Sequence, residues 1–232
     1  MIKLNEVNST NNYIKERLNE LDNFECVFTM NQTNGKGRTG HTWVSEPNKN
    51  VAMSLLIKDD KIIKNFNLVS IVTGVVVAEY LETLGLNKVA IKWPNDVYVN
   101  EKKICGILLE GNIPEYIIIG IGINVNQTNF RELNASSIKN EIGIKIDPAL
   151  VAVDINDILL DTLRHLDTNV NSLIERYEEL DYLLNKTISF SYKGENIEGI
   201  AKGIDFDGSL KVLYKNNLIN VNTSEVNLVR KA

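Results

Sequence analysis

The stretch KVAIKWPNDVYVNEKKICGILLEGNIPEYIIIGIGINVN, residues 88–126, contains four apolar runs that are separated by turn-forming residues. Val and Ile dominate these runs, and β-branched residues are enriched in strands. Between the second and third runs, Asn100, Glu101 and Lys102 indicate a hairpin turn. The stretch therefore predicts four consecutive strands: KVAIKW, DVYVN, KICGILLE and YIIIGIGINVN.

The segments before this stretch predict two more strands and two helices. ECVFTM and VAMSLLI have the composition of strands. Ser9 or Thr10 can cap a helix that reaches about Leu21, because apolar side chains recur at helical spacing there. In residues 65–84 apolar side chains occupy every side of a helix, so we expect a buried helix that ends at Gly85.

The segments after it predict two helices followed by a change of pattern. Asp147 caps and Pro148 opens one helix, and a second runs from about Val170 to Leu183. Beyond Asn185 the chain consists of short strands and turns, KTISFSY, EGIAKGI, LKVLY and NLINVN. Short strands at this spacing are typical of a small β-barrel.

The predicted fold class is therefore α/β (α+β), in two domains. Residues 1–184 form a mixed β-sheet with packed helices, and residues 185–232 form a small all-β barrel. A chain of 232 residues is long enough for one domain of medium size and a small appendage.

Composition and charge exclude several classes of protein. Cys26 and Cys105 lie far apart and the chain has two histidines, so neither a disulfide framework nor a dedicated metal site is supported. The N-terminus lacks the apolar core of a signal peptide, and the longest apolar runs are shorter than a membrane span. A net charge of −5 without a basic block argues against nucleic acid as the main partner. We therefore expect a cytoplasmic protein that binds neither DNA nor a membrane.

The segment NGKGRTGHTW, residues 34–43, fits the dinucleotide fingerprint G-x-G-x-x-G and nearly fits a P-loop. Both signatures require a helix directly after the glycines. Pro47 and the turn residues around it leave no room for one, so neither signature holds, and the spacing to Asp59 is a coincidence. Two interpretations stay open: a surface loop, or a loop whose glycines, with Lys36 and Arg38, fold over an anion.

Five segments in order along the chain resemble the signature segments of the biotin protein ligases. The resemblance extends from about Val7 to Arg230 and includes a small C-terminal barrel. The segments are STNN (9–12), QTNGKGRTGHTW (32–43), KWPND (92–96), KICGILLEG (103–111) and GIGINVN (120–126).

This resemblance implies an ATP-dependent, AMP-forming carbon–nitrogen ligase. In that family, biotin and Mg-ATP give biotinyl-adenylate and pyrophosphate, and a lysine of a biotin carboxyl carrier protein domain then displaces AMP. Many members also carry an N-terminal DNA-binding domain. Because this chain begins at the catalytic segment, the resemblance implies the monofunctional type. The oligomeric state, for which a homodimer is one option, and the identity of the carrier stay open.

The charged residues of these segments match the catalytic positions of the family. Arg38 and Lys36 resemble the pair that contacts the biotin carboxylate and the phosphate, and Lys103 matches the lysine that bridges them. Asn95 and Asp96 resemble the nucleotide side, where Mg²⁺ carried with ATP prefers oxygen ligands. From the residues alone, a solvated loop, a hairpin-end lysine and a simple turn explain the same pattern. The implied catalytic residues are Lys103, Arg38 and Asp96, and the implied nucleotide-binding residues are Arg38, Asn95, Asp96, Lys103 and Asn124.

Short polar side chains near the N-terminus suit the ureido ring of biotin, which offers two N–H donors and one carbonyl. A helix N-cap is the competing explanation for Ser9 and Thr10. Glycines inside apolar strands suggest close approach of a ligand, although a bulge explains each one equally well. The resemblance assigns the following residues to biotin: Ser9, Thr10, Asn11, Gln32, Gly35, Lys36, Gly37, Arg38, Trp43, Lys103, Gly106, Leu108, Gly120 and Gly122.

The chain also departs from the family pattern. Lys36, Thr39 and His41 stand where many members have arginine, so we expect the loop to bind anions more weakly. The segment 135–138, which corresponds to a region that closes over adenine, has no aromatic residue. Two alternative functions stay open: a lipoate–protein ligase, which shares the fold and the carrier-lysine chemistry, and a non-catalytic biotin or nucleotide sensor.

Overall fold

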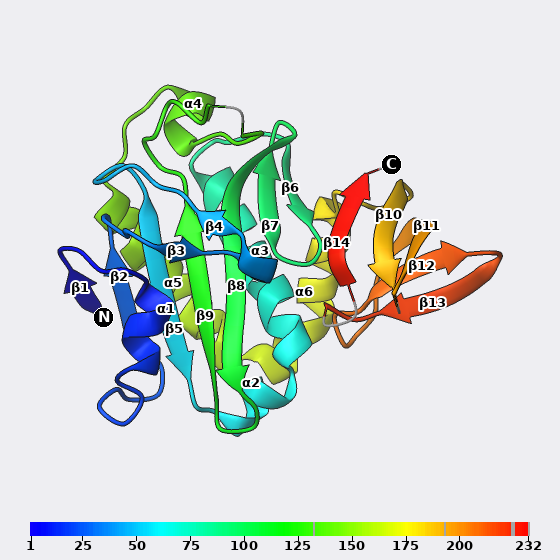
Figure 1. The fold of residues 1–232 in the computed structure, drawn as a ribbon, viewed down its shortest axis with the longest axis horizontal. Coiled ribbons are helices and arrows are strands. Elements are labelled where there is room, and N and C mark those ends of the chain that lie inside the picture. Colours follow the sequence, from blue (N-terminus) through cyan, green and yellow to red (C-terminus); the bar gives the residue numbers. More distant parts are fainter. Residues whose placement is uncertain (132, 193, 224–225, 232) are drawn as a thin grey trace.

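The computed structural model describes residues 1–131, 133–192, 194–223 and 226–231, the last range by its backbone. Seven strands form a central mixed sheet (Figure 1). They are β1 (Ile2–Leu4), β2 (Cys26–Thr29), β5 (Val51–Ile57), β6 (Val89–Lys92), β7 (Asp96–Val99), β8 (Lys102–Asn112) and β9 (Tyr116–Ile123). Their order is β1-β2-β5-β9-β8-β7-β6, and the β1–β2 pair is parallel whereas the other pairs are antiparallel.

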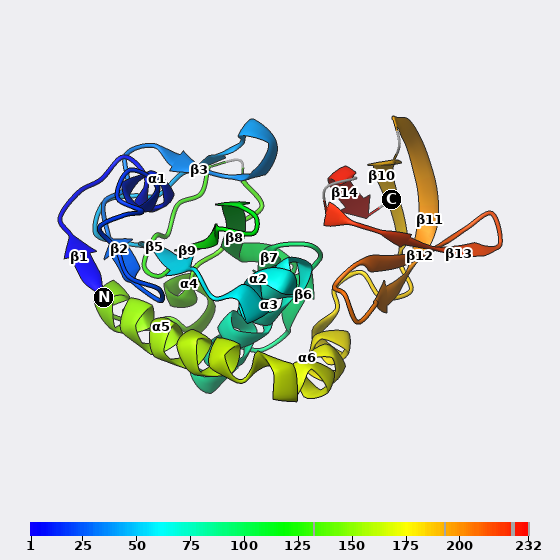
Figure 2. The same cartoon turned by 90° about the horizontal axis from the view of Figure 1, so that it is seen from below.

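Helices cover the two faces of this sheet unequally. They are α1 (Thr10–Lys15), α2 (Asp60–Lys64), α3 (Phe66–Thr83), α4 (Ile138–Ile142), α5 (Pro148–Arg164) and α6 (Leu166–Leu180). Figure 2 shows α3, α5 and α6 on one side of the sheet and α1 on the other, where it is joined by a small hairpin of β3 (Gly35–Lys36) and β4 (Thr42–Trp43). One face is therefore fully packed, and the other is left for a site.

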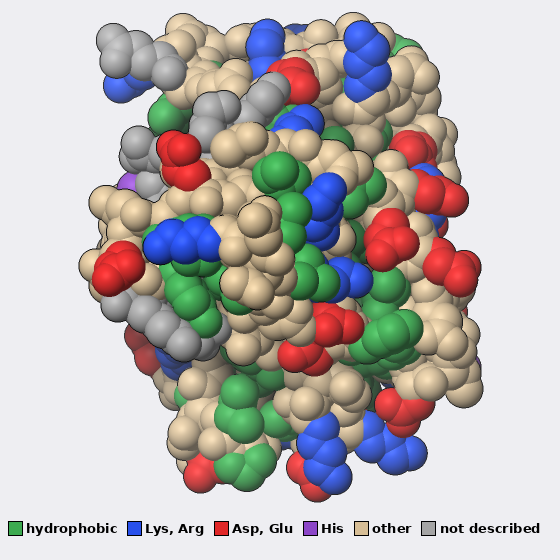
Figure 3. All heavy atoms as spheres, turned by 90° about the vertical axis from the view of Figure 1, so that its right-hand side faces the viewer, with side chains coloured by type: hydrophobic (Ala, Val, Ile, Leu, Met, Phe, Trp, Pro, Cys, Tyr) green, Lys and Arg blue, Asp and Glu red, His purple; other side chains and the backbone are tan. Residues whose placement is uncertain are grey.

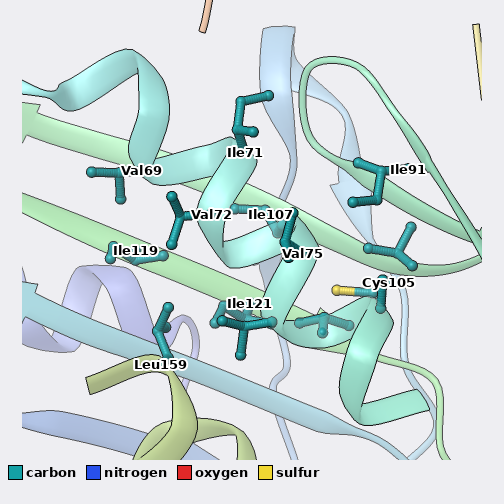
Figure 4. Close-up of a cluster of buried hydrophobic side chains, with 14 of the residues drawn as sticks. Val69, Ile71, Val72, Val75, Ile91, Cys105, Ile107, Ile119, Ile121 and Leu159 are labelled. Atoms are coloured by element: carbon teal, nitrogen blue, oxygen red, sulfur yellow. The ribbon is translucent and has the colours of Figure 1, made fainter. Parts of the chain in front are cut away.

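Helix α3 is the centre of the packed face. Val69, Val72 and Val75 on α3 contact the same apolar cluster as Ile119 of β9 and Leu159 of α5 (Figure 4). By length and composition alone α3 could cross a membrane, with a mean hydropathy of 1.3. The expectation that the longest apolar runs are shorter than a membrane span did not include this helix. However, 72% of that window is buried inside the protein, as expected for a core helix.

Capping residues define where the helices begin. Ser9 and Asp147 act as N-caps through their side chains, as predicted, and the unexpected helix α2 is capped by Asp59. Two helix ends differ from the prediction. Helix α1 ends at Lys15 and continues as turns, and α6 ends at Leu180 because the chain then pairs with the edge strand β6, where Tyr182 N donates to Ile91 O.

A second, antiparallel sheet follows α6. Its strands are β10 (Thr187–Tyr192), β11 (Glu195–Ile204), β12 (Leu210–Tyr214), β13 (Asn217–Val221) and β14 (Val226–Lys231), in the order β13-β12-β11-β10-β14. Strand β14 was not predicted, but the fold class is confirmed: a mixed sheet with helices and a small all-β part. On the side of the molecule that carries this sheet, acidic and basic side chains are interspersed rather than separated (Figure 3).

The second sheet contacts the segments that were singled out in the sequence. The indole nitrogen of Trp93 donates to the carbonyl of Gly208 at 3.1 Å, and both groups are buried. Arg38 Nη2 donates to the carbonyl of Thr223, also at 3.1 Å. The C-terminal part of the chain therefore lies beside the KWPND segment and the glycine loop.

Candidate functional site

The open face of the central sheet is organised in three rows of residues that are paired across strands. Because side chains alternate between faces along a strand, residues two apart share a face and lie about 7 Å apart. The rows are Asp96–Gly106–Gly122–Ala52, then Leu108–Gly120–Ser54, then Glu110–Ile118–Leu56. The first row combines one charged side chain with small residues, and the second combines Leu108 with a glycine and a serine. In the third row, Ile118 and Leu56 belong to the apolar cluster beneath α1.

A cavity of about 210 Å³ lies on the first two rows. The glycine hairpin and the N-terminal end of α1 supply its other walls. Most residues assigned from the sequence line it: Ser9, Thr10, Asn11, Gln32, Lys36, Gly37, Arg38, Trp43, Asn95, Asp96, Lys103, Gly106, Leu108, Gly120 and Gly122. Segments more than a hundred residues apart in the sequence thus form one site.

The glycines of β8 and β9 make room for side chains of the protein itself. A Cβ atom at Gly122 would lie 2.4 Å from the indole ring of Trp43, and one at Gly106 would lie 3.1 Å from the same ring. A Cβ atom at Gly120 would lie 2.5 Å from Asn11 Oδ1. The sequence suggested a ligand or a bulge at these positions. The register between β8 and β9 is regular, and Trp43 and Asn11 approach these glycines closely. The glycines also line the cavity, and the approach of a ligand stays a prediction.

The charged end of the cavity contains Lys103, Asp96, Arg38 and Asn95. Lys103 Nζ lies 2.6 Å from Asp96 Oδ1, and Arg38 Nη1 donates to Asn95 Oδ1 at 3.5 Å. Burial lowers the pKa of the Arg38 guanidinium, and the negative charge of Asp96 acts in the opposite direction. Two cations beside one carboxylate make this end suited to anions such as a carboxylate or a phosphate.

The opposite end is lined mainly by uncharged polar side chains. Gln32 Oε1 accepts from the backbone N–H of Thr10 at 2.9 Å, and the hydroxyl groups of Thr10 and Ser54 lie 2.7 Å apart, where Thr10 donates because Ser54 donates to Asn11 Oδ1. Ser9 Oγ accepts from Asn12 N, so the N-cap explanation for Ser9 holds together with its place in the cavity. This end can exchange hydrogen bonds with a small ring that has both donors and acceptors.

The glycine loop is a hairpin and not a nucleotide-binding turn before a helix. Its strands are joined by a single 3-10 turn, Arg38–Gly40, and no α-helix follows it before β5. Lys36 is exposed, and its ammonium group donates to Asn12 Oδ1 at 2.8 Å, on the side of α1. The rejection of both nucleotide motifs is therefore confirmed, and Asp59, which seemed to match one of them, is the cap of α2.

Two assigned residues lie outside the cavity lining. Gly35 is packed against the backbone of Trp43, where a Cβ atom would lie 2.4 Å from the Trp43 carbonyl oxygen. Asn124 is buried, and its Nδ2 donates to the carbonyl of Ser136 at 3.0 Å. Ser136 N in turn donates to the carbonyl of Lys103 at 2.9 Å. In this structure Asn124 therefore connects the segment 135–138 to the backbone of Lys103.

Several residues of the site were not predicted from the sequence. Ser54 belongs to a strand that is buried throughout, so only its pairing with Gly120 shows which face it occupies. Glu110 contacts Asn11 from the third row, and His41 lines the cavity without a role from the sequence. Other lining residues without a prior role are Thr39, Thr42, Ala52, Met53, Lys92, Trp93, Pro94, Ile107 and Ile121.

Residues 4–124 match the profile of the Biotin/lipoate A/B protein ligase family, and residues 183–229 match the Biotin protein ligase C terminal domain. The chain belongs to the biotin/lipoate protein ligase family. It is 31% identical over 217 residues to the bifunctional ligase/repressor BirA of Escherichia coli, covering 88% of this chain and 66% of that relative. It is also 26% identical to the biotin--[acetyl-CoA-carboxylase] ligase of Mycobacterium tuberculosis, covering 79% of this chain and 71% of that relative.

A solved structure of the family shares the whole fold. The biotin protein ligase from Aquifex aeolicus, in complex with biotin and ATP, superposes with a TM-score of 0.89 at 27% identity. The match covers 100% of this chain and 98% of the Aquifex chain. Both sheets of this chain therefore belong to one architecture that the family uses.

Proposed function

We propose that this chain activates biotin with ATP and transfers it to a lysine of a carrier protein. The observation that carries the proposal is the polarity of one cavity. A neutral polar end with Thr10 and Gln32 lies on one side of Trp43, and the charged end with Lys103, Arg38 and Asp96 lies on the other. Biotin has the same polarity, with a ureido ring at one end and a carboxylate at the other.

In the first step, a biotin carboxylate oxygen attacks the α-phosphorus of ATP. The new P–O bond forms as the bond to the β-phosphate oxygen breaks, and pyrophosphate leaves. Lys103 and Arg38 would neutralise the two anions as they converge, because fixed positive charge acts strongly in a site with little water. The buried indole N–H of Trp43, which lacks a hydrogen-bond partner among the described residues, supplies a further donor in this cavity.

In the second step, the ε-amine of a carrier lysine attacks the acyl carbon of biotinyl-adenylate. The amide C–N bond forms, the C–O bond to phosphate breaks, and AMP leaves while the amine loses a proton. Asp96 pairs with Lys103 and can accept that proton. Mg²⁺ brought with ATP would neutralise phosphate charge, and one carboxylate plus phosphate oxygens is a donor set that Mg²⁺ accepts, so Asp96 fits either role.

The polar end favours biotin over lipoate. A dithiolane ring has no N–H or carbonyl, so it could exchange no hydrogen bonds with the polar groups around Thr10, Asn11 and Gln32. The convergence of Lys103, Arg38 and Asp96 at one end likewise favours catalysis over a passive sensor. The test is pyrophosphate release from ATP with biotin or lipoate as the acid. We expect release that depends on biotin; release with lipoate alone, or none, contradicts the proposal.

We further propose that the chain divides near residue 184 into a catalytic domain and a C-terminal domain. The match of residues 183–229 to a separate C-terminal domain supports this division. A biotin carboxyl carrier domain in the cytoplasm is the proposed partner, and a homodimer is compatible with the proposal.

Cys26 and Cys105 are buried free thiols, and burial raises the pKa of Cys26 to about 12, which fits an inert structural role.

A further inference from the structure

The polar end of the cavity is supported by an ion pair that the proposed mechanism does not use. Glu110 Oε1 lies 2.6 Å from Lys15 Nζ, and the two side chains are 24% and 34% exposed. Glu110 lies in the third row, behind the cavity, and Lys15 ends α1. Glu110 reaches the cavity through Asn11, whose Nδ2 donates to Glu110 Oε2 at 2.7 Å.

This contact determines which way the Asn11 amide points. An ionised carboxylate can only accept hydrogen bonds, so the group that faces Glu110 must be the NH₂ of Asn11. The carbonyl oxygen then faces Ser54 and Gly120: it accepts from Ser54 Oγ at 2.5 Å and packs against Gly120 in the cavity wall. A carbonyl oxygen has two lone pairs, and Ser54 uses one. Asn11 therefore presents an acceptor to this end of the cavity.

The surroundings keep this orientation. Asn11 is 4% exposed, so its amide cannot turn out into water. Turning it in place would bring its oxygen against the Glu110 carboxylate. Burial raises the pKa of Glu110, but the hydrogen bonds from Lys15 and Asn11 and the positive charges of Lys15 and Lys36 outweigh it, and the net pKa is lowered. Glu110 thus stays an acceptor at neutral pH.

We propose that Glu110 is a positioning residue that sets ligand specificity at the ring end of the cavity. By fixing the Asn11 carbonyl toward the cavity, it favours a ring that carries an N–H, such as a cyclic urea, over a ring without one, such as a dithiolane. This inference rests on the proposed function, because it assumes that the ring of biotin occupies the polar end. Glu110 acts through Asn11 and does not touch the ligand.

The test replaces the Glu110 carboxylate by an amide, and then also replaces the Asn11 amide by a carboxylate. In Glu110→Gln the side chain keeps its shape but can donate as well as accept, so both orientations of the Asn11 amide become allowed. We expect the KM for biotin to rise about tenfold, the effect of losing one hydrogen bond to a buried group, with kcat little changed. Inhibition by lipoate should not weaken in parallel, since a dithiolane does not use the acceptor. In the double variant Asn11→Asp/Glu110→Gln, either carboxylate oxygen at position 11 is an acceptor, so the KM for biotin should return toward that of the parent.

The control is Glu82→Gln on α3, on the other side of the sheet. This variant also removes a carboxylate from a partly exposed ion pair, here with Arg176. It should leave the KM for biotin and the inhibition by lipoate unchanged. A parental KM for biotin in folded Glu110→Gln overturns the inference, as does a double variant that is no better than Glu110→Gln. If Glu110→Gln does not fold, the double variant is measured alone: a KM for biotin near that of the parent supports the inference, and a raised KM overturns it. Absence of biotin-dependent pyrophosphate release by the parent instead overturns the proposed function.

Discussion

The two faces of the central sheet are built from alternate residues of the same strands, yet they differ in kind. On β9, Ile117 and Ile119 are fully buried in the core beneath α3 and α5, whereas Gly120 and Gly122 lie beneath Asn11 and Trp43 at the cavity. The packed face excludes water with large side chains. The open face can carry glycines, charges and unpaired polar groups because the packed face supplies the stability.

The largest expected effect separates the faces by stability. Ile119→Ala should lower the free energy of unfolding by about 2–5 kcal/mol, since it leaves a cavity in a close-packed core. Leu108→Ala, on the open face and partly exposed, should cost much less. Urea denaturation of both variants is the measurement. Equal losses of unfolding free energy in the two variants would contradict the claim that the packed face supplies most of the stability.

The next effect is on catalysis. Lys103→Ala should slow biotin-dependent pyrophosphate release at least about 100-fold, roughly 3 kcal/mol, because a charge that neutralises the converging anions is lost. Its unfolding free energy should change little, since Lys103 lies at the hairpin end and its side chain is 30% exposed. Lys102→Ala, at the adjacent exposed position, is the matched control and should keep parental activity. Parental release by Lys103→Ala would remove Lys103 from the mechanism.

A smaller effect concerns retention of the intermediate. Arg38→Gly should weaken the binding of biotinyl-adenylate by about 1.5–3 kcal/mol, the value of one charge-assisted hydrogen bond. The adenylate then escapes and acylates other amines. In a mixture of carrier and an unrelated lysine-rich protein, labelling of the unrelated protein should rise relative to the carrier. An unchanged labelling ratio, together with a parental dissociation rate of the adenylate, would contradict this role.

The smallest effect is a pH dependence on the open face. The folded-state pKa of Glu110 is lowered from 4.5, so its ion pair stabilises the fold above the unfolded pKa, and this contribution is lost as the pH falls through the folded pKa. The difference in unfolding free energy between the parent and Glu110→Gln should therefore be full at neutral pH and shrink in acid. Denaturation at a series of pH values measures it. A difference that stays constant into the acid range would show that Glu110 is not ionised in the pair.

Local signals in the sequence predicted much of the fold. The Asp147–Pro148 start of α5, the run that forms β5, and the end of α3 before Gly85, which has a φ of +85°, depend on neighbouring residues only, and the structure confirms them. The Asn100–Glu101 turn was also predicted, and both residues adopt positive φ. Helix α6 spans Leu166–Leu180 and not Val170 to Leu183 as predicted; its end is set by pairing of the following residues with β6, which no local signal encodes.

The site was predicted only in part, because some of its residues are brought together by strand pairing, which no local signal encodes. The resemblance named Lys103, Arg38 and Asp96, and the structure brings these three residues together. Ser54 and Glu110 were missed because their positions depend on the register of β5, β9 and β8, which joins residues far apart in the sequence. The strand glycines were noticed, but the groups that approach them come from β4 and α1.

We propose above that the cavity on the open face activates biotin for transfer to a lysine. The most direct test is to incubate the protein with ATP, a purified carrier domain, and biotin and lipoate in equal amounts, and to determine by mass spectrometry what is attached to the carrier. We expect one biotinyl group on a single carrier lysine, and no biotinyl group when ATP is omitted. A lipoyl group on that lysine, or an unmodified carrier, would contradict it.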